Sequence, residues 1–449
     1  MTGAPSPIWH PFTQHGLNEA RPLVESAQGA LLHCRDGRTL IDAISSWWVI
    51  THGHGEPRII AAIRDQAERL DQVIFAGFTH EPAERVARGL IRLTGAHLSS
   101  PDPLAPDPLA PDPLAHVFFS DSGSTCVEVA LKMALGYWHH RAHRAGASEA
   151  RHRIIVMEHS YHGDTIGTMS VGERGVFNHA YAPLLFDVAR IPYPAPGREQ
   201  ATLDALEAAC RAPEKPAALI VEPLVLGSGG MLFYPPATLR AMADICAAHD
   251  VLFIADEVMT AWGRTGTLFA CQQAGVTPDI LCTAKGLTGG SIPLAATLCR
   301  GKIFDAHLSG DRADMFFHSS SFTANPIACA AAAANIALWE GEDGGEDMAT
   351  RLASVGAMVA GHVAALADHP AFENVRRLGT IAAMDLRVGA GAGYLSDVAP
   401  ALRAWFLEQG LLLRPLGNTV YVLPPYCTSA AQFGRIFAAI GEAGSRFGA

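Results

Sequence analysis

Lys285 stands where a chain of this kind could build a nucleophilic amine. It follows the apolar run Ile280–Ala284 and is followed at once by the glycine-rich string Gly286–Gly290. The apolar run predicts a buried strand, and ligands in open α/β sheets bind at the carboxyl ends of such strands. A lysine that is desolvated there loses its charge, and its amine can then attack a carbonyl group. Taken alone, the position is equally compatible with a solvated loop lysine.

Three other groups stand in comparable positions along the chain. Asp256 ends the apolar run Val251–Ala255, where a buried carboxylate is unfavourable unless it is paired. The string Ser122–Thr125 follows another apolar run and opens a helical pattern, so it offers backbone N–H groups and a partial positive charge. Tyr161 follows the next run and could stack on a flat ligand. For Asp256 the alternatives are a helix N-cap or a structural ion pair, for Ser122–Thr125 ordinary helix capping, and for Tyr161 an aromatic residue of a surface loop.

Together these groups match the needs of one cofactor. Pyridoxal phosphate requires a lysine amine for its aldehyde and a carboxylate for its pyridine nitrogen. It also requires N–H groups and hydroxyls for its phosphate, and a flat partner for its ring. Lys285, Asp256, Ser122–Thr125 and Tyr161 supply these in turn, so we predict pyridoxal phosphate held as a Schiff base on Lys285. No GxxxxGK[ST] loop or GxSxG elbow occurs, which counts against P-loop nucleotide hydrolases and elbow-type serine esterases.

Two neighbours of these residues receive no catalytic role. Glu257 adjoins Asp256 but points the other way on a strand, so the two carboxylates cannot share a role. We take His162 as structural, because the cofactor lysine can already perform the proton transfers. We expect no metal site, since no acidic ligand is spaced with the three histidines of one helical stretch, His139, His140 and His143.

The elements that must position these groups alternate regularly. Short apolar runs predict strands, and the stretches between them predict helices that end near Gly, Pro or Asp. This alternation favours an α/β fold with a mainly parallel sheet covered on both faces. The predicted strands are His116–Ser120, Arg153–Met157, Ala218–Pro223, Val251–Asp256, Ile280–Ala284 and Ala295–Cys299. The predicted helices are Thr125–Arg144, Thr202–Ala212 and Pro236–His249.

Both ends of the chain differ from this central region. The pattern of the C-terminal part predicts a smaller α+β domain. It has a helical passage at Asp343–Gly361, short apolar runs at Ile381–Leu386, Leu411–Leu413 and Val420–Leu423, and a last helix at Ser429–Phe447. The hairpin-like Asp36-Gly37 suggests that the N-terminus joins this domain. We therefore predict a small domain from residues 1–54 and 331–449, and a large domain from residues 55–330. Residues 101–115 repeat PDPLA three times and predict an exposed, extended loop within the large domain.

Composition excludes several classes of protein. The chain has 449 residues and a formal net charge of −11, which disfavours binding to the nucleic-acid backbone. Nine scattered cysteines without a C-x-x-C pair are typical of a reducing compartment. The N-terminus has no secretory pattern, and the longest apolar run, Pro326–Trp339, is too short for a bilayer. We expect a cytoplasmic enzyme without a membrane segment.

The strings around these residues resemble those of the class III (ω-type) aminotransferases. The likeness covers nearly the whole chain apart from the PDPLA insertion. Its most specific part comprises Asp256-Glu257-Val258, Gly263-Arg264-Thr265-Gly266, Pro278-Asp279-Ile280 and Lys285–Gly290. The resemblance implies fold-type I, with a small α+β domain built from both chain ends. It makes Lys285 the catalytic Schiff-base lysine and Asp256 the partner of the pyridine nitrogen. It assigns the binding of the phosphate to Gly123 and Ser124. It assigns the two faces of the ring to Tyr161 and Val258.

Finer strings resemble the branch of this family that makes 7,8-diaminononanoate in biotin biosynthesis. They are Trp9-His10-Pro11-Phe12, Ser45-Ser46-Trp47-Trp48, Arg414-Pro415 and Pro424-Pro425-Tyr426. The resemblance implies 8-amino-7-oxononanoate as the acceptor and S-adenosylmethionine as the usual donor, although some relatives use lysine. Trp47 and Trp48 would form an aromatic wall for the aliphatic chain, with Tyr161 also near the substrate. Arg414 would hold the carboxylate by a two-pronged contact. For Trp47 and Trp48 the alternative is plain core packing, and for Arg414 it is a surface ion pair.

Two positions depart from the family's usual pattern. A tyrosine is usual after the N-terminal His-Pro, whereas this chain has Phe12, so a hydroxyl contact with the substrate is lost or moved. The phosphate-contacting loop reads His318–Phe322. Its Ser320 and Ser321 keep hydroxyls for the phosphate, and Ser319 replaces a glycine on the substrate side. In the family this loop reaches the cofactor of the neighbouring subunit, which implies a homodimer with shared active sites.

Two other interpretations remain at this stage. Another class III aminotransferase, acting on an ornithine-, β-alanine- or lysine-type donor, would share every cofactor residue and differ only near Trp47, Trp48 and Arg414. A catalytically inactive scaffold on the same fold is disfavoured, because a scaffold needs neither an electron sink nor its lysine.

Overall fold

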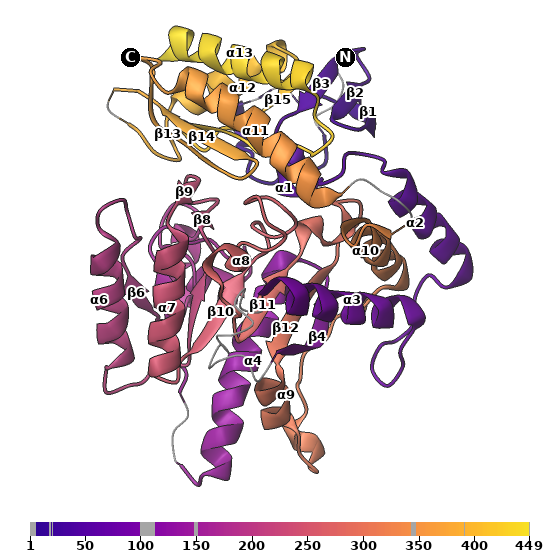
Figure 1. Ribbon diagram of the computed structural model, residues 1–449, viewed down its shortest axis with the longest axis vertical. Helices are drawn as coiled ribbons and strands as arrows, with labels where there is room; N and C mark the ends of the chain where they lie inside the picture. The colour runs from indigo at the N-terminus through magenta and orange to yellow at the C-terminus, as the bar shows by residue number, and fades with distance from the viewer. Residues whose placement is uncertain are drawn as a thin grey trace.

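A seven-stranded sheet forms the centre of the larger lobe of the molecule (Figure 1). The computed structural model describes residues 6–17, 19, 21–98, 113–147, 151–342, 347–389 and 391–448. The sheet has the order β4-β12-β11-β10-β7-β5-β6, and of these seven strands β12 alone runs antiparallel to its neighbours. The strands are β4 Leu114–Ser120, β5 Ile154–Met157, β6 Ala189–Ile191, β7 Ala218–Val221, β10 Leu252–Asp256, β11 Ile280–Thr283 and β12 Ala295–Arg300. The predicted, mainly parallel α/β sheet is confirmed.

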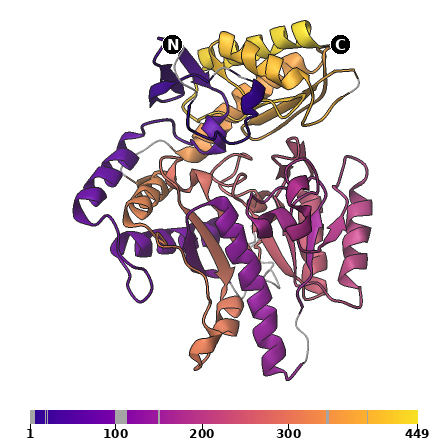
Figure 2. The same ribbon diagram turned by 180° about the vertical axis from the view of Figure 1, so that it is seen from behind.

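Alternate residues of the central strands face two separate apolar cores. In β10, Leu252 and Ile254 pack on the side of α4 and α9, whereas Phe253 and Ala255 pack on the opposite side. Figures 1 and 2 show α4 crossing the face opposite to α7. Because both faces are buried, the strands read as continuous apolar runs in the sequence. The large-lobe helices are α2 Pro57–Arg69, α3 Glu81–Leu98, α4 Gly123–Arg144, α5 Ile166–Ser170, α6 Glu199–Cys210, α7 Pro236–Ala248, α8 Cys271–Ala274, α9 Gly301–His307 and α10 Pro326–Trp339.

The second lobe joins the two ends of the chain. One sheet has the order β1-β2-β3-β15, in which N-terminal β3 pairs in parallel with C-terminal β15. The other sheet, β13-β14-β16, packs against α11. Both termini lie at this lobe in Figure 2. The elements are β1 Val24–Gln28, β2 Leu31–Cys34, β3 Thr39–Asp42, α11 Met348–Leu366, β13 Phe372–Leu378, β14 Ile381–Leu386, α12 Val398–Glu408, β15 Leu411–Leu412, β16 Thr419–Val422 and α13 Ala430–Phe447.

The predicted loop and domain boundaries agree with the structure only in part. Residues 101–112 of the PDPLA repeat lie outside the described residues, whereas Leu114 and Ala115 belong to β4. The loop prediction was wrong for these two residues, because Leu114 is buried and pairs with β12. The predicted boundary at 330/331 falls inside α10. The division into domains stays a prediction, supported by the mixed sheet of both chain ends.

One described helix, α11, is long and apolar enough to cross a membrane by length and composition alone. A single such helix is weak evidence, because core helices pass the same test. Its Leu352, Val355 and Val359 are buried in the core of the second lobe. The helix also packs against β13, β14 and α13, which is the environment of a core helix.

Candidate active site

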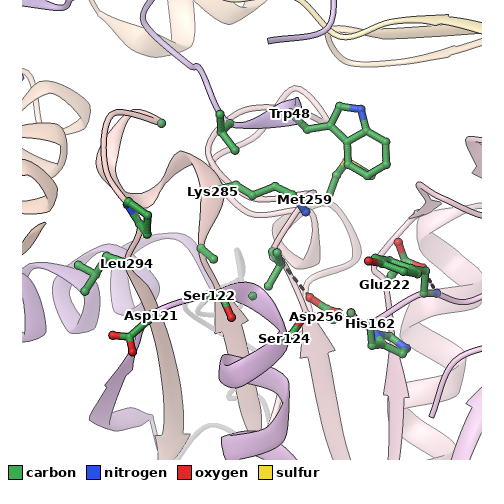
Figure 3. Close-up of a pocket in the computed structure, with 18 of the residues that line it drawn as sticks. Trp48, Asp121, Ser122, Ser124, His162, Glu222, Asp256, Met259, Lys285 and Leu294 are labelled. Carbon is green, nitrogen blue, oxygen red and sulfur yellow. Dashed lines mark hydrogen bonds and ion pairs between the residues drawn. The ribbon is translucent and has the colours of Figure 1, made fainter. Parts of the chain in front are cut away.

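A cavity of about 480 Å³ opens where the carboxyl ends of the parallel strands meet (Figure 3). Its lining comes from segments that follow β4, β5, β7, β10 and β11, together with the approach to β12. The volume is typical of a site for a small molecule or a cofactor. The lining residues are Trp48, Val49, Asp121, Ser122, Gly123, Ser124, Tyr161, His162, Gly163, Glu222, Asp256, Val258, Met259, Ala284, Lys285, Gly290, Ser291, Ile292, Pro293 and Leu294.

Lys285 projects its amine into this cavity (Figure 3). The residue follows β11 with φ of 44°, a left-handed conformation that is rare for a side chain of this size. Such strain is found mainly where the surrounding structure holds a functional group in place. Burial lowers the pKa of the amine, against the opposing effect of Asp256 and Glu222. The structure therefore favours the neutral, nucleophilic form of Lys285 more than water does.

Asp256 ends β10 and faces the cavity from below Lys285 in Figure 3. Its Oδ2 lies 2.6 Å from Nδ1 of His162, and its Oδ1 accepts the backbone N–H of Val258 at 3.1 Å. His162 is buried, and its Nε2 has no hydrogen-bond partner among the described residues. The imidazole thus fixes the orientation of the carboxylate. The sequence did not reveal this pair, because the two residues lie 94 positions apart.

Glu257 points away from the cavity, as the strand geometry predicted. Its carboxylate accepts the hydroxyl of Thr260 and the backbone N–H groups of Ala270 and Cys271. Burial raises its pKa. The carboxylate holds the following loop together and does not face Lys285.

The start of α4 faces the lower part of the cavity (Figure 3). Ser122 and Thr125 form a capping box, which leaves the backbone of Gly123 and Ser124 at the cavity wall. A Cβ atom at Gly123 would lie 2.7 Å from Val258 Cγ1, so glycine permits this close approach. Ser124 Oγ accepts the backbone N–H of Asp164 at 3.2 Å. A helix N-terminus with a glycine and a serine is a suitable site for a phosphate.

Tyr161 and Glu222 also line the cavity, and Glu222 lies beside His162 in Figure 3. Glu222 Oε1 accepts the backbone N–H of Tyr161 at 2.9 Å, and its Oε2 accepts that of Gly227 at 3.0 Å. Burial raises the pKa of Glu222 to about 7, with Asp256 acting in the same direction. Sequence reasoning missed Glu222, which directly follows the apolar β7, whereas Asp256 is the last residue of β10. Both carboxylates stand at the carboxyl end of a buried strand, which is the signal that selected Asp256.

Trp47 and Trp48 do not form one continuous wall. Trp48 is buried at the cavity, with Lys285 Nζ 5.3 Å from its ring centre. Its Nε1 donates to the Tyr421 hydroxyl at 3.0 Å. Trp47 is 40% exposed and points to the outside, because the backbone between the two residues is not helical. The two rings face different surroundings in the structure, and their role as a wall for the substrate stays a prediction.

Trp47 belongs to a second group of side chains that we call the outer rim: Phe12, Trp47, Phe177, Tyr394 and Arg414. The Arg414 guanidinium lies 5.3 Å from the Trp47 ring centre and donates to the backbone oxygen of Phe12 at 2.9 Å. The ring of Phe177 lies 4.6 Å from Tyr394, 6.0 Å from Phe12 and 6.0 Å from Tyr161. Arg414 has no acidic partner among the described residues. Phe177 and Tyr394 were missed, because they lie in irregular segments without periodicity.

Ser319, Ser320 and Ser321 lie outside the lining of this cavity. Ser320 Oγ donates to Asp121, a lining residue, while Ser319 Oγ lies 3.2 Å from Thr323 Oγ1. The three serines are accessible to solvent, and Phe322 beside them is 61% exposed. Within one chain the structure therefore does not bring this loop to the Lys285 cavity.

The residues that are present fit pyridoxal phosphate. The amine of Lys285, the carboxylate of Asp256 and the N-terminus of α4 line one cavity of suitable volume. Tyr161 and Val258 offer surfaces for the two faces of a ring. We call the residues Lys285, Asp256, His162, Glu222 and Tyr161, together with the start of α4, the inner wall.

A sequence model of the family described as Aminotransferase class-III matches residues 14–443. The chain belongs to the class III aminotransferase family. It is an enzyme that transfers amino groups and uses pyridoxal 5′-phosphate, and its fold is the fold-type I architecture of class III transaminases. The cofactor predicted from the sequence is thereby confirmed.

Individual class III aminotransferases match over nearly their whole length. The adenosylmethionine-8-amino-7-oxononanoate aminotransferase of Synechococcus elongatus is 45% identical over 447 residues, covering 97% of each chain. The crystal structure of the enzyme of that name from Methanocaldococcus jannaschii has a TM-score of 0.88 at 29% identity, covering 98% of this chain and 97% of that one. A PLP-bound amine transaminase from an uncultivated Pseudomonas species has a TM-score of 0.87 at 29% identity, covering 99% and 100%.

Proposed function

We propose that this aminotransferase converts 8-amino-7-oxononanoate to 7,8-diaminononanoate, with S-adenosylmethionine as the amino donor. The observation that carries the proposal is Arg414, whose guanidinium has no acidic partner among the described residues and lies in an aromatic rim beside the cavity. The acceptor has a carboxylate, an aliphatic chain and a ketone, and the rim and cavity offer a group for each. The 45% identity to the Synechococcus elongatus enzyme supports the same assignment.

The inner wall supplies the groups that the transfer needs. Pyridoxal phosphate, when bound, supplies the electron sink that labilises bonds to the substrate's amine-bearing carbon. Lys285 Nζ would bind the cofactor and then move the proton between the substrate and the cofactor. The carboxylate of Asp256, oriented by His162, would keep the pyridine nitrogen protonated. Gly123 and Ser124 would hold the phosphate, and Tyr161 and Val258 would fix the ring plane.

The outer rim would select the acceptor. Arg414 would bind its carboxylate through two N–H groups, because its guanidinium is planar and always charged. Trp47 and Phe12 would cover the aliphatic chain, and Trp48 would close the cavity above Lys285. Donor and acceptor occupy the site in turn, so one surface must accept two shapes. The aromatic side chains of the rim can do this, since their contacts are mainly apolar.

We also propose that the enzyme is a homodimer in which two chains share each site. Ser319 would face the substrate, and Ser320 and Ser321 would contact the phosphate, in the cavity of the partner. Exposed large apolar side chains near this loop support an interface there, among them Phe317 at 66% and Phe322 at 61%. The cytoplasm is the proposed compartment, because the nine cysteines, all within the described residues, are not joined in disulfides and eight of them are buried.

A donor panel with 8-amino-7-oxononanoate as the acceptor tests this function. The purified holoenzyme is incubated with S-adenosylmethionine, lysine, ornithine or β-alanine, and 7,8-diaminononanoate is measured by mass spectrometry. We expect product with S-adenosylmethionine and little with the ω-amino acids. If product forms with lysine alone, lysine is the amino donor and 8-amino-7-oxononanoate is still the acceptor. No product with any donor, alongside transamination of a simple ω-amine, would contradict the proposal and favour another class III activity.

A further inference from the structure

The segment that carries Trp47 and Trp48 has an unusual backbone. It begins after β3 and includes the short α1, Ser45–Trp48. Ser45, Ser46 and Trp48 have φ values of 54°, 60° and 67°, in the left-handed region that favours glycine. These angles turn Trp47 towards Arg414 and Trp48 towards Lys285. Such a conformation persists only where neighbouring groups hold it in place.

Asp42 holds the middle of this segment. Its side chain is fully buried, and its two carboxylate oxygens lie 2.8 and 2.7 Å from the backbone nitrogen of Ser46. It also accepts the Ser46 hydroxyl at 3.1 Å and the N–H of Ile44 at 3.3 Å. His54 Nε2 lies 2.8 Å from Oδ2 and anchors the carboxylate itself. A buried carboxylate with this many donors is held firmly.

The ends of the segment are held by other groups. Ser45 Oγ donates to the Leu423 carbonyl at 2.8 Å, and Arg264 donates to the Trp48 carbonyl at 3.3 Å. Ser46, by contrast, has hydrogen bonds only with Asp42 among the described residues. Asp42 therefore holds Ser46, the residue directly before Trp47, between the anchored ends of the segment.

We propose that Asp42 is a positioning residue for the aminotransferase reaction, which acts through Ser46 to direct Trp47 to the outer rim and Trp48 to the amine of Lys285. It touches neither the cofactor nor the substrate. The part that concerns Trp47 rests on the proposed acceptor, whereas the part that concerns Trp48 needs only the family's activity. Loss of Asp42 should let the segment relax, so that both rings lose their places at once.

Two substitutions and two controls test this role in the full-length holoenzyme. Asp42→Ala removes every contact, and Asp42→Asn keeps one oxygen that can still accept the Ser46 N–H. Ser46→Ala removes only the hydroxyl contact. Asp36→Asn is the matched control, because Asp36 lies on the preceding turn, is exposed, and forms an ion pair with the nearby Arg38. All rates are divided by the amount of bound cofactor, measured from its absorbance, so that unfolded protein does not count.

We expect kcat/KM for the acceptor to fall roughly 10- to 100-fold in Asp42→Ala, with KM rising, because small displacements near a reacting group have effects of this size. Asp42→Asn should lie between Asp42→Ala and wild type, and Asp36→Asn should match wild type. A purely structural role would lower the amount of bound cofactor and leave the normalised KM unchanged, which would overturn the proposal. If Asp42→Ala does not fold, the same comparison is made with Asp42→Asn.

A second measurement tests the role of Asp42 independently of the proposal that 8-amino-7-oxononanoate is the acceptor. The single-turnover reaction of the bound cofactor with S-adenosylmethionine, and separately with lysine, is followed by absorbance without any acceptor. Asp42→Asn should slow this step relative to Asp36→Asn even if 8-amino-7-oxononanoate proves not to be the acceptor. Equal single-turnover rates in the two variants would contradict the role of Asp42 at Trp48.

Discussion

The inner wall and the outer rim of the active site are built in different ways. The inner wall consists of residues that follow the strands of one sheet, so the fold places Lys285, Asp256 and Glu222 together directly. The outer rim takes its residues from five separate parts of the chain, including both ends. The comparison suggests that the sheet fixes the chemistry shared by the family, while selectivity depends on segments that can change independently.

The largest expected effect lies in the inner wall, at Lys285. Lys285→Ala should remove the visible absorbance of the bound cofactor and lower kcat by at least about 10⁴-fold, because the amine both holds the cofactor and moves the proton. Absorbance spectra and steady-state kinetics measure both effects. Lys215→Ala, at an exposed lysine, is the control and should retain both. A yellow, active Lys285→Ala enzyme would contradict the assignment of the inner wall.

A smaller loss is expected when the carboxylate that faces the cavity is neutralised. Asp256→Asn should lower kcat about 10²- to 10³-fold, since a preorganised charge at the pyridine nitrogen is lost. Glu257→Gln, one residue further, should reduce thermal stability but keep the normalised kcat, because the Glu257 carboxylate bonds to the loop that follows it and does not face the cavity. If Asp256→Asn and Glu257→Gln lower the normalised kcat to the same extent, the role of each carboxylate does not depend on whether it faces the cavity.

The smallest effect concerns the pH dependence of stability. The folded pKa of Glu222, about 7, lies above its ordinary value, so the folded chain binds this proton more tightly than the unfolded chain. The resulting stability is fully present below about pH 4.5 and is lost as pH rises through about 7. Between pH 5 and pH 8, the apparent Tm of the cofactor-free enzyme should fall by about 2–6 °C relative to Glu222→Gln.

Differential scanning fluorimetry of both proteins across this pH range measures the difference. Glu68→Gln, at an exposed position of α2, is the control and should follow the wild-type curve. Parallel curves for wild type and Glu222→Gln would mean that Glu222 does not titrate near neutral pH in the folded chain.

Lys285, Asp256 and the start of α4 could be predicted from the sequence, because each stands at the end of an apolar run or just after it. Lys285 lies just after β11 and Asp256 is the last residue of β10, and parallel strands bring their carboxyl ends to one edge. The sheet order and the pairing of β3 with β15 could not be read from local patterns, since they depend on contacts between distant segments. The partnership of His162 with Asp256 was hidden for the same reason.

The outer rim was harder to predict. Trp47 and Trp48 are adjacent, which suggested one aromatic surface, but positive φ values at Ser46 and at Trp48 itself send the rings apart. Sequence patterns do not reveal positive φ at a serine or tryptophan, because these residues rarely adopt it. Tyr394 was not predicted at all, although its hydroxyl lies beside Arg414 and its ring packs on Phe177.

Arg414 offers the most direct test that the outer rim selects the acceptor. The measurement is kcat/KM for 8-amino-7-oxononanoate and for its methyl ester, in wild type and in Arg414→Met. Wild type should prefer the carboxylate by roughly 10- to 100-fold, since a charge-assisted hydrogen bond contributes about 1.5–3 kcal/mol. In Arg414→Met the preference should fall close to one, with activity on the ester unchanged. An undiminished preference for the carboxylate in Arg414→Met would contradict the account.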